Sequence, residues 1–212
     1  MKYSKYSTLK IQHYCIAPES LMYDGLRVLR RLYPTVKNKY RVYRLRNQGA
    51  RIGKNVFIHP KALFGGKVAN LFVDDESYLG ASEYYLLDRI HIGKRVLIGE
   101  RCYLCTGSHA YNEDFKTITS PIIIEDDVWI STSAAVLGGS VIKKGAVLGA
   151  FAVVRGYVDE NFVVVGNPAV PKGTRATNFT TISPSDMGSA NSDTITKKCI
   201  ERLSAKLKHS KN

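Results

Sequence analysis

The chain has 212 residues, of which 44% are hydrophobic, so it can bury one core without disulfides or metals. It contains four cysteines, too few for a disulfide scaffold in a chain of this length, which favours a reducing compartment. No uncharged apolar run approaches the ~20 residues of a membrane-spanning helix, and no secretory signal is evident at the N-terminus. The net charge of +13 suggests nucleic-acid binding, but residues 1–54, 55–170 and 171–212 carry +11, −3 and +5, so the middle of the chain is mildly acidic and argues against that class.

The first predicted elements are two basic helices. Residues 18–33 place apolar side chains on one helical face and precede Pro34, which should end the helix. A second helix is expected over residues 36–47 and should be closed by Gly49. The sequence therefore predicts a basic helical N-terminal segment over residues 1–50.

A period of six residues begins at Ile92. The first position of each unit is Ile, Leu or Val in nine of nine units, and the fifth is Val, Cys, Ser or Ala. A period of six fits neither a helix nor a plain amphipathic strand, but it fits a short strand followed by a corner. Three units make one triangular coil, and each coil pairs with the coils above and below it. The units begin at Ile92, Ile98, Leu104, Ile124, Ile130, Val136, Ile142, Leu148 and Val154.

The repeat predicts an all-β fold, a parallel β-helix, over residues 51–172. A rougher set of sixes starts at Ile52, and its register slips between 64 and 73 and again between 79 and 92, which should mark bulges or small loops. The next break separates Leu104 from Ile124 by 20 residues where six are expected. The 14 extra residues lack the aliphatic period, so we expect a protruding loop there.

The C-terminal part differs in composition from the repeats. Residues 173–192 are polar and rich in Ser and Thr, which predicts a linker. Residues 193–212 carry apolar side chains at helical spacing among lysines and arginines, which predicts a basic C-terminal helix.

Several motifs in a fixed order resemble those of the hexapeptide-repeat O-acetyltransferases, above all the colanic-acid and the maltose/galactoside acetyltransferases. They are the run 103–109, the loop after it, the segment 124–130 and the sequence Gly-Asn-Pro-Ala at 166–169. The resemblance covers roughly residues 45–172. It implies a left-handed β-helix, a homotrimer, acetyl-CoA as acetyl donor, and a site between two subunits. The implied acceptor is a saccharide hydroxyl, in the biosynthesis of a surface polysaccharide such as capsule, exopolysaccharide or lipopolysaccharide.

His109 is the candidate catalytic residue. A sugar hydroxyl is a poor nucleophile at neutral pH, and a histidine can take its proton as attack begins, an effect worth about 10²- to 10⁴-fold. The resemblance places His109 as this general base. Colanic-acid-type relatives usually carry Asp after this histidine, whereas this chain has Ala110. The partner that orients the imidazole is therefore open between Glu113, Asp114 and a backbone carbonyl.

The resemblance also supplies candidate binding residues. Asp88 aligns with an acidic residue that contacts sugar hydroxyls, and a carboxylate can accept hydrogen bonds from two hydroxyls. Ser82 and Glu83 are further acceptor candidates. The donor candidates match positions along the thioester, the pantetheine and the phosphates of CoA: Trp129, Thr132, Ala150, Arg155 and Lys172, with Arg175 as an alternative cation.

Other readings of the sequence are weaker. Cys102 and Cys105 spell a CxxC motif but fall in strand positions, whereas redox pairs lie at helix N-termini. A zinc hydratase of the same fold needs three histidine ligands with two closely spaced, and the histidines here are scattered, so no metal is expected.

Three alternatives remain for the function and the basic ends. The acceptor could be another small molecule, such as an amino sugar or a xenobiotic, or the β-helix could be a non-catalytic scaffold. The basic helices could cap the solenoid or contact an anionic membrane surface, with no nucleic acid involved. The expected location is cytoplasmic, or peripheral at the inner face of the membrane.

Overall fold

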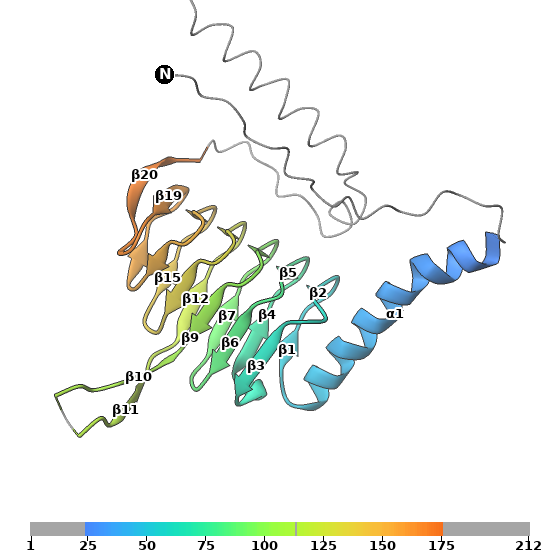
Figure 1. The fold of residues 1–212 in the computed structure, drawn as a ribbon, viewed down its shortest axis with the longest axis horizontal. Coiled ribbons are helices and arrows are strands. Elements are labelled where there is room, and N and C mark those ends of the chain that lie inside the picture. The colour runs from blue at the N-terminus through green and yellow to red at the C-terminus, as the bar shows by residue number, and fades with distance from the viewer. Residues whose placement is uncertain (1–23, 113, 176–212) are drawn as a thin grey trace, which may run out of the picture. The chain divides into compact units, whose positions relative to one another are not determined.

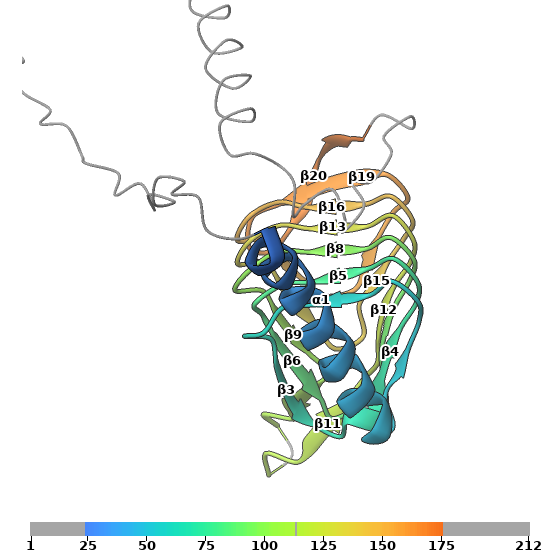
Figure 2. The ribbon, with the colours of Figure 1, turned by 90° about the vertical axis from the view of Figure 1, so that its right-hand side faces the viewer.

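A computed structural model describes residues 24–112 and 114–175, with side chains from residue 36 onward. The predicted C-terminal helix and nearly all of the predicted linker lie outside the described residues. Most of the described chain winds through three parallel sheets that form the walls of a triangular β-solenoid (Figures 1 and 2). The predicted fold class is therefore confirmed, while the left-handed winding and the domain limits stay predictions.

Each coil contributes one short strand to each wall, except that the last coil has no strand in the third sheet. The first sheet consists of β1 (Arg51–Ile52), β4 (Leu71–Val73), β7 (Ile90–Ile92), β12 (Ile122–Ile124), β15 (Val141–Ile142) and β18 (Tyr157–Val158). The second sheet consists of β2 (Phe57–Ile58), β5 (Tyr78–Leu79), β8 (Leu97–Ile98), β13 (Trp129–Ile130), β16 (Val147–Leu148), β19 (Phe162–Val165) and the antiparallel β20 (Val170–Thr174). The third sheet consists of β3 (Leu63–Gly66), β6 (Glu83–Leu86), β9 (Tyr103–Cys105), β14 (Ala135–Leu137) and β17 (Val153–Val154).

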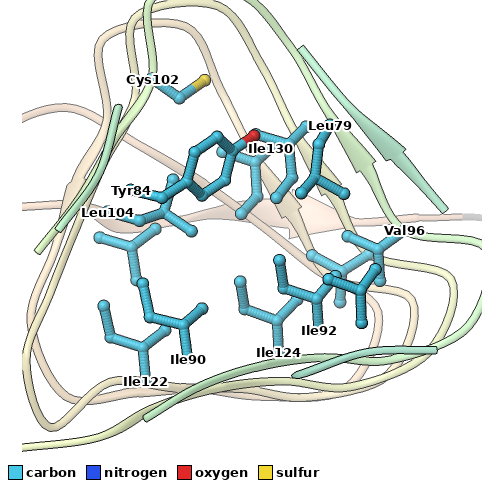
Figure 3. Close-up of a cluster of buried hydrophobic side chains, with 14 of the residues drawn as sticks. Leu79, Tyr84, Ile90, Ile92, Val96, Cys102, Leu104, Ile122, Ile124 and Ile130 are labelled. Atoms are coloured by element: carbon cyan, nitrogen blue, oxygen red, sulfur yellow. The ribbon is translucent and has the colours of Figure 1, made fainter. Parts of the chain in front are cut away.

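The core is the inside of the triangle. Aliphatic side chains from all three walls point into it in Figure 3. Ile92, Ile124 and Ile142 stand opposite one another in successive coils and are fully buried. The first position of each six therefore faces the axis, as the repeat predicts.

The corners explain the rest of the period. The fourth residue of a six has a positive φ even where it is not glycine, as at Arg95 (54°), Asp127 (61°) and Ser133 (61°). This left-handed residue turns the chain and places the fifth residue inside the corner, where Val128 and Ala134 are fully buried. Small fifth residues are favoured because the corner interior is closely packed.

The predicted shifts in the register of the repeat are present in the structure, and the structure contains one more. Ile52 pairs with Val73, and the 3₁₀ helix η1 (Val68–Asn70) takes up the extra residues between them. At the other end, Ile142 pairs with Val158 rather than with residue 160. The prediction of a full six starting at Val154 is therefore wrong, because this coil is two residues short.

The predicted protruding loop is confirmed, and it is a β-hairpin. Strands β10 (Gly107–His109) and β11 (Thr117–Thr119) pair antiparallel and project from the corner between the third and first sheets (Figure 1). The hairpin base is closed by the Ser120 N–H, which donates to the Thr106 carbonyl at 2.9 Å. Ser108, the fifth residue of its six, is therefore exposed and does not fill a corner.

The two predicted helices form one continuous helix. Helix α1 (Asp24–Asn47) continues through Pro34, and Gly49 follows its end with a φ of 97°, as expected. The predicted stop at Pro34 is wrong. An interior proline weakens a helix by ~3 kcal/mol, but the residues after Pro34 gain contacts with the first coil that the local sequence does not reveal. Among the described residues, no helix is long and apolar enough to cross a membrane.

The C-terminal half of α1 closes the first coil. The Arg46 guanidinium donates to the carbonyls of Ile52 and Gly53, and Arg41 donates to the Ile58 carbonyl at 2.6 Å. Asn38 both donates to and accepts from the backbone of this coil. Within the described residues no earlier coil pairs with these backbone groups, and the side chains satisfy them instead. Part of the basic N-terminal charge therefore caps the solenoid.

Candidate functional site

His109 lies at the end of β10, and its side chain is exposed. Its Nδ1 is 2.8 Å from the Phe115 carbonyl oxygen. Asp114 and Phe115 have positive φ values of 45° and 53°, and this tight turn brings the carbonyl back over the imidazole. Since a carbonyl only accepts, Nδ1 carries the proton and Nε2 presents its lone pair.

Of the three partners left open by the sequence, the structure shows the backbone carbonyl. Glu113 lies outside the described residues. Ala110 offers no side-chain acceptor, and in this structure the imidazole bonds to the main chain instead. Phe115 is a residue that sequence reasoning missed, because a main-chain carbonyl leaves no signal in a residue pattern.

Asp88 is tied to the base of the same hairpin. Its N–H donates to the Thr106 Oγ1 at 2.9 Å, and the Thr106 hydroxyl donates to the Tyr85 carbonyl at 2.8 Å. One carboxylate oxygen of Asp88 accepts from the Arg89 N–H at 2.6 Å. The other makes no hydrogen bond within the described part of the chain, so it is available to a ligand. Thr106 was not predicted as a site residue.

The other two acceptor candidates occupy different environments. Ser82 is only 2% exposed, and its hydroxyl accepts from the Cys102 N–H and donates to the Gly99 carbonyl. Ser82 thus completes a corner of the coil. Glu83 is exposed at the start of β6, at the opposite end of that strand from Asp88.

Two adjoining hollows run along the corner beside the hairpin. The first, of about 70 Å³, is lined by the hairpin base, including Ser108 and Thr119. The second, of about 290 Å³, extends over the last coils to Pro171. Leu137 and Arg155 line both hollows. The exposed Arg155 thus places a cation midway along a groove that begins next to β10, a shape and charge that fit an extended anionic molecule such as CoA.

The remaining donor candidates are not all in this groove. Trp129 faces outward from the second sheet, and Thr132 and Ala150 lie at the corner between the second and third sheets. Lys172 is exposed on β20, next to the groove-lining Pro171. Within one chain, the structure brings Arg155 and the neighbourhood of Lys172 together with the hairpin but leaves the other three apart.

The alternative cation has a structural contact. The Arg175 guanidinium donates to the Asp127 carbonyl at 2.7 Å, and burial lowers its pKa from the ordinary value. Arg175 thereby fastens the end of β20 to the corners of two earlier coils. Strand β20 runs to Thr174, two residues beyond the predicted end of the solenoid domain.

No metal site is found among the described residues. They contain no group of His, Cys, Asp and Glu side chains that could hold an ion. Cys102 and Cys105 are both free and buried, and burial raises the pKa of the Cys102 thiol. A thiol held protonated in this way is a poor metal ligand and a poor nucleophile.

Comparison with known proteins identifies the family to which this chain belongs. No protein-family model matches the chain. An Escherichia coli protein named colanic acid biosynthesis acetyltransferase WcaF is 38% identical over 141 residues, which are 65% of this chain and 76% of that protein. The chain belongs to the hexapeptide-repeat acetyltransferases.

Two further comparisons agree with this assignment. The galactoside O-acetyltransferase of Lactococcus lactis is 30% identical over 135 residues, covering 60% of this chain and 64% of the relative. The solved structure of a hexapeptide-repeat acetyltransferase from Vibrio cholerae, complexed with acetyl-CoA, shares the fold with a TM-score of 0.59. It is 24% identical, and the match covers 71% of this chain and 89% of that one.

Proposed function

We propose that this acetyltransferase moves the acetyl group of acetyl-CoA to a hydroxyl of a saccharide in surface-polysaccharide biosynthesis. The observation that carries the proposal is the hydrogen bond from His109 Nδ1 to the Phe115 carbonyl, which leaves Nε2 as a free base on the hairpin whose strands line one end of the groove. The relatives named for colanic acid biosynthesis and galactoside acetylation support a sugar as acceptor. We propose a cytoplasmic location, where acetyl-CoA is available.

In this proposal His109 Nε2 takes the proton of the acceptor hydroxyl while the hydroxyl oxygen attacks the thioester carbonyl. The tetrahedral intermediate collapses as the carbon–sulfur bond breaks. The imidazolium then returns the proton to the departing CoA sulfur, so the base is restored. The Phe115 carbonyl stabilises the imidazolium through the Nδ1 proton, which is the contribution a carboxylate makes elsewhere. Backbone N–H groups of the coil are the proposed oxyanion donors.

Asp88 is the proposed acceptor clamp. Its unpaired carboxylate oxygen can accept a hydrogen bond from a sugar hydroxyl, and its backbone is anchored to Thr106, just before the hairpin. This anchoring keeps the distance between the clamp and the base constant. When acceptor and donor are already held in place, less entropy is lost on reaching the transition state. The reaction is therefore faster.

The groove is the proposed site for CoA, with Arg155 and Lys172 facing its phosphates. Trp129, Thr132 and Ala150 lie on another part of the same chain, so they reach the donor only if a second copy supplies them. The proposed homotrimer does this, because each groove would be completed by the neighbouring subunit. We keep these three residues as donor ligands within that assembly.

The proposal is tested by the His109→Ala substitution. We expect acetylation of sugar acceptors, measured as CoA release, to fall by about 10²- to 10⁴-fold because the base is lost. Binding of CoA, measured by calorimetry, should be retained. His91→Ala removes an outward-facing histidine of the first sheet and should leave the rate unchanged. Undiminished activity of His109→Ala, or no binding of CoA by the unmodified protein, would overturn the proposed function.

We further propose a peripheral contact with an anionic membrane surface through α1. The face of α1 opposite the buried Val42 and Leu45 presents Tyr40 and Tyr43, which are 66% and 60% exposed. Exposed basic side chains flank these tyrosines, namely Lys39 on one side and Arg44 on the other. Tyrosines between cations are suited to the boundary between lipid headgroups and acyl chains.

A further inference from the structure

The outer face of the third sheet carries two tyrosines beside the candidate site. Tyr85 on β6 is 43% exposed and Tyr103 on β9 is 40% exposed. They stand in neighbouring strands and point outward, Tyr85 opposite Cys105 and Tyr103 opposite Glu83. We call Tyr85 and Tyr103 the tyrosine platform.

The Tyr85 ring lies flat on the sheet. Its partner on β3 is Gly65, and a Cβ atom at Gly65 would stand 2.7 Å from the Tyr85 Cδ2 and 3.0 Å from Cε2. The ring therefore covers the space that a side chain at Gly65 would fill. One face of the ring is supported by backbone, and the other is open to a ligand.

Tyr103 shares the outer face of β9 with Cys105, which is two residues nearer the hairpin. Hydrogen bonding with the Cys105 side chain raises the Tyr103 pKa to about 12. The Cys105 thiol in turn donates to the Gly107 carbonyl at 3.2 Å. The ring is thus held in place by a chain of contacts that ends two residues before His109.

The platform joins the candidate active site to a separate hollow. On one side, the Tyr85 carbonyl bonds to Thr106, which also holds Asp88. On the other side, a hollow of about 210 Å³ is lined by Tyr103 and by the charged side chains of Glu83, Lys61 and Arg101. The four residues of β6 span about 13 Å, which is longer than one sugar ring.

We propose that the tyrosine platform binds an oligosaccharide chain, so that the acetylated sugar lies at His109 and the following units stack on Tyr85 and then Tyr103 and end beside Glu83. Sugar rings present apolar C–H faces that pack on flat aromatic rings, while their hydroxyls bond to charged groups at the edges. The inference rests on the proposed function and makes its acceptor an oligosaccharide rather than a free monosaccharide.

The experiment compares acceptor length in two separate assays. Glucose, galactose and their 1,4-linked tetrasaccharides are tested for binding by saturation-transfer NMR without acetyl-CoA, and for acetylation by CoA release. We expect at least one tetrasaccharide to bind about tenfold tighter than its monosaccharide, the gain of a stacked ring or two. Tyr85→Ala and Tyr103→Ala should remove this gain by raising KM for the tetrasaccharide, with kcat and monosaccharide binding unchanged.

Control variants separate stacking from folding and hydrogen bonding. Tyr85→Phe and Tyr103→Phe keep the ring and should keep the gain. Phe72→Ala removes an outward-facing aromatic of the first sheet, in the same coil as Tyr85, and should also keep it. The proposal is overturned if no tetrasaccharide gains over its monosaccharide, if the gain survives in the alanine variants, or if these variants dissociate an oligomer and so identify the tyrosines as a subunit contact.

The two assays also distinguish this inference from the proposed function. Tyrosine-dependent binding of a tetrasaccharide without any acetylation would support the tyrosine platform and contradict the proposed reaction. Acetylation that does not depend on acceptor length would support the reaction and contradict the platform.

Discussion

At the scale of single residues, Tyr84 is the one large hydroxyl-bearing side chain among the fully buried residues described. It is 1% exposed, and its ring stacks on Phe64 with centroids 5.1 Å apart. Its Oη has no hydrogen-bond partner within the described part of the chain, and Figure 3 shows it beside Leu79 and Ile130. Burial raises the pKa of this hydroxyl well above its usual value. An unsatisfied buried hydroxyl destabilises the folded state.

We therefore predict that Tyr84→Phe stabilises the protein. The substitution keeps the stacked ring and removes the desolvated hydroxyl, so the free energy of unfolding should rise by about 1 kcal/mol. Urea unfolding followed by circular dichroism measures the change. Tyr157→Phe, at an exposed position, serves as the matched control and should have no effect. A loss of stability in Tyr84→Phe would show that the hydroxyl has a partner, such as a buried water.

At the scale of elements, one row of corners carries charges of alternating sign. The corners between the first and second sheets contain Lys54, then Asp74–Glu76, Lys94–Arg95, Glu125–Asp127, Lys143–Lys144 and Asp159–Glu160. Arg95 forms a bidentate pair with Asp127, at 2.7 and 2.9 Å, and Lys143 pairs with Glu125. Each coil thus attracts its neighbours and would repel a copy of itself, which favours the observed stacking order.

The Glu125–Lys143 pair predicts a pH-dependent stability. The Lys143 ammonium lowers the pKa of the Glu125 carboxyl, so the folded protein releases this proton more readily than the unfolded chain does. The stabilisation is present above the ordinary pKa of a glutamate and is lost as the pH falls through the lowered value. Because the pair is solvent-accessible, screening by water keeps its contribution to stability small.

The variant Glu125→Gln should therefore have a slightly lower free energy of unfolding than the unmodified protein at neutral pH. The difference from the unmodified protein should disappear in acid. Chemical unfolding at several pH values measures both effects. Glu100→Gln, at an exposed corner of the neighbouring row, is the control. A difference that persisted unchanged in acid would contradict an ionic origin.

At the scale of the whole molecule, the net charge of +13 belongs to the ends of the chain and not to the solenoid. Part of the N-terminal charge, at Arg41 and Arg46, satisfies carbonyls of the first coil. Lys39 and Arg44 beside the exposed tyrosines have no such contact in the described structure. These are the charges proposed to meet anionic lipid.

We predict that the full chain sediments with vesicles containing phosphatidylglycerol and not with pure phosphatidylcholine. Binding should weaken with added salt, because exposed charges are screened. The double variant Tyr40→Ser/Tyr43→Ser should reduce binding several-fold, whereas Phe151→Ser, an equally exposed aromatic of a corner, should not. Equal binding to both vesicle types would contradict the membrane proposal.

The amino-acid sequence determined the solenoid, its interrupted register, the protruding segment at His109 and the family resemblance. These follow from residue periodicity and short motifs, since every coil needs aliphatic residues toward the axis and small ones at its corners. The same local rules misjudged Pro34 and the last coil, where contacts or spacing outside the repeat intervene.

Only the tertiary structure decided which groups meet. It identified the Phe115 carbonyl as the partner of His109, buried Ser82 in a corner, and turned Arg41 and Arg46 into caps. It also laid the tyrosine platform beside the hairpin. Each of these depends on backbone groups and coil stacking that join residues distant in the sequence, and such contacts leave no periodic trace in the order of the amino acids.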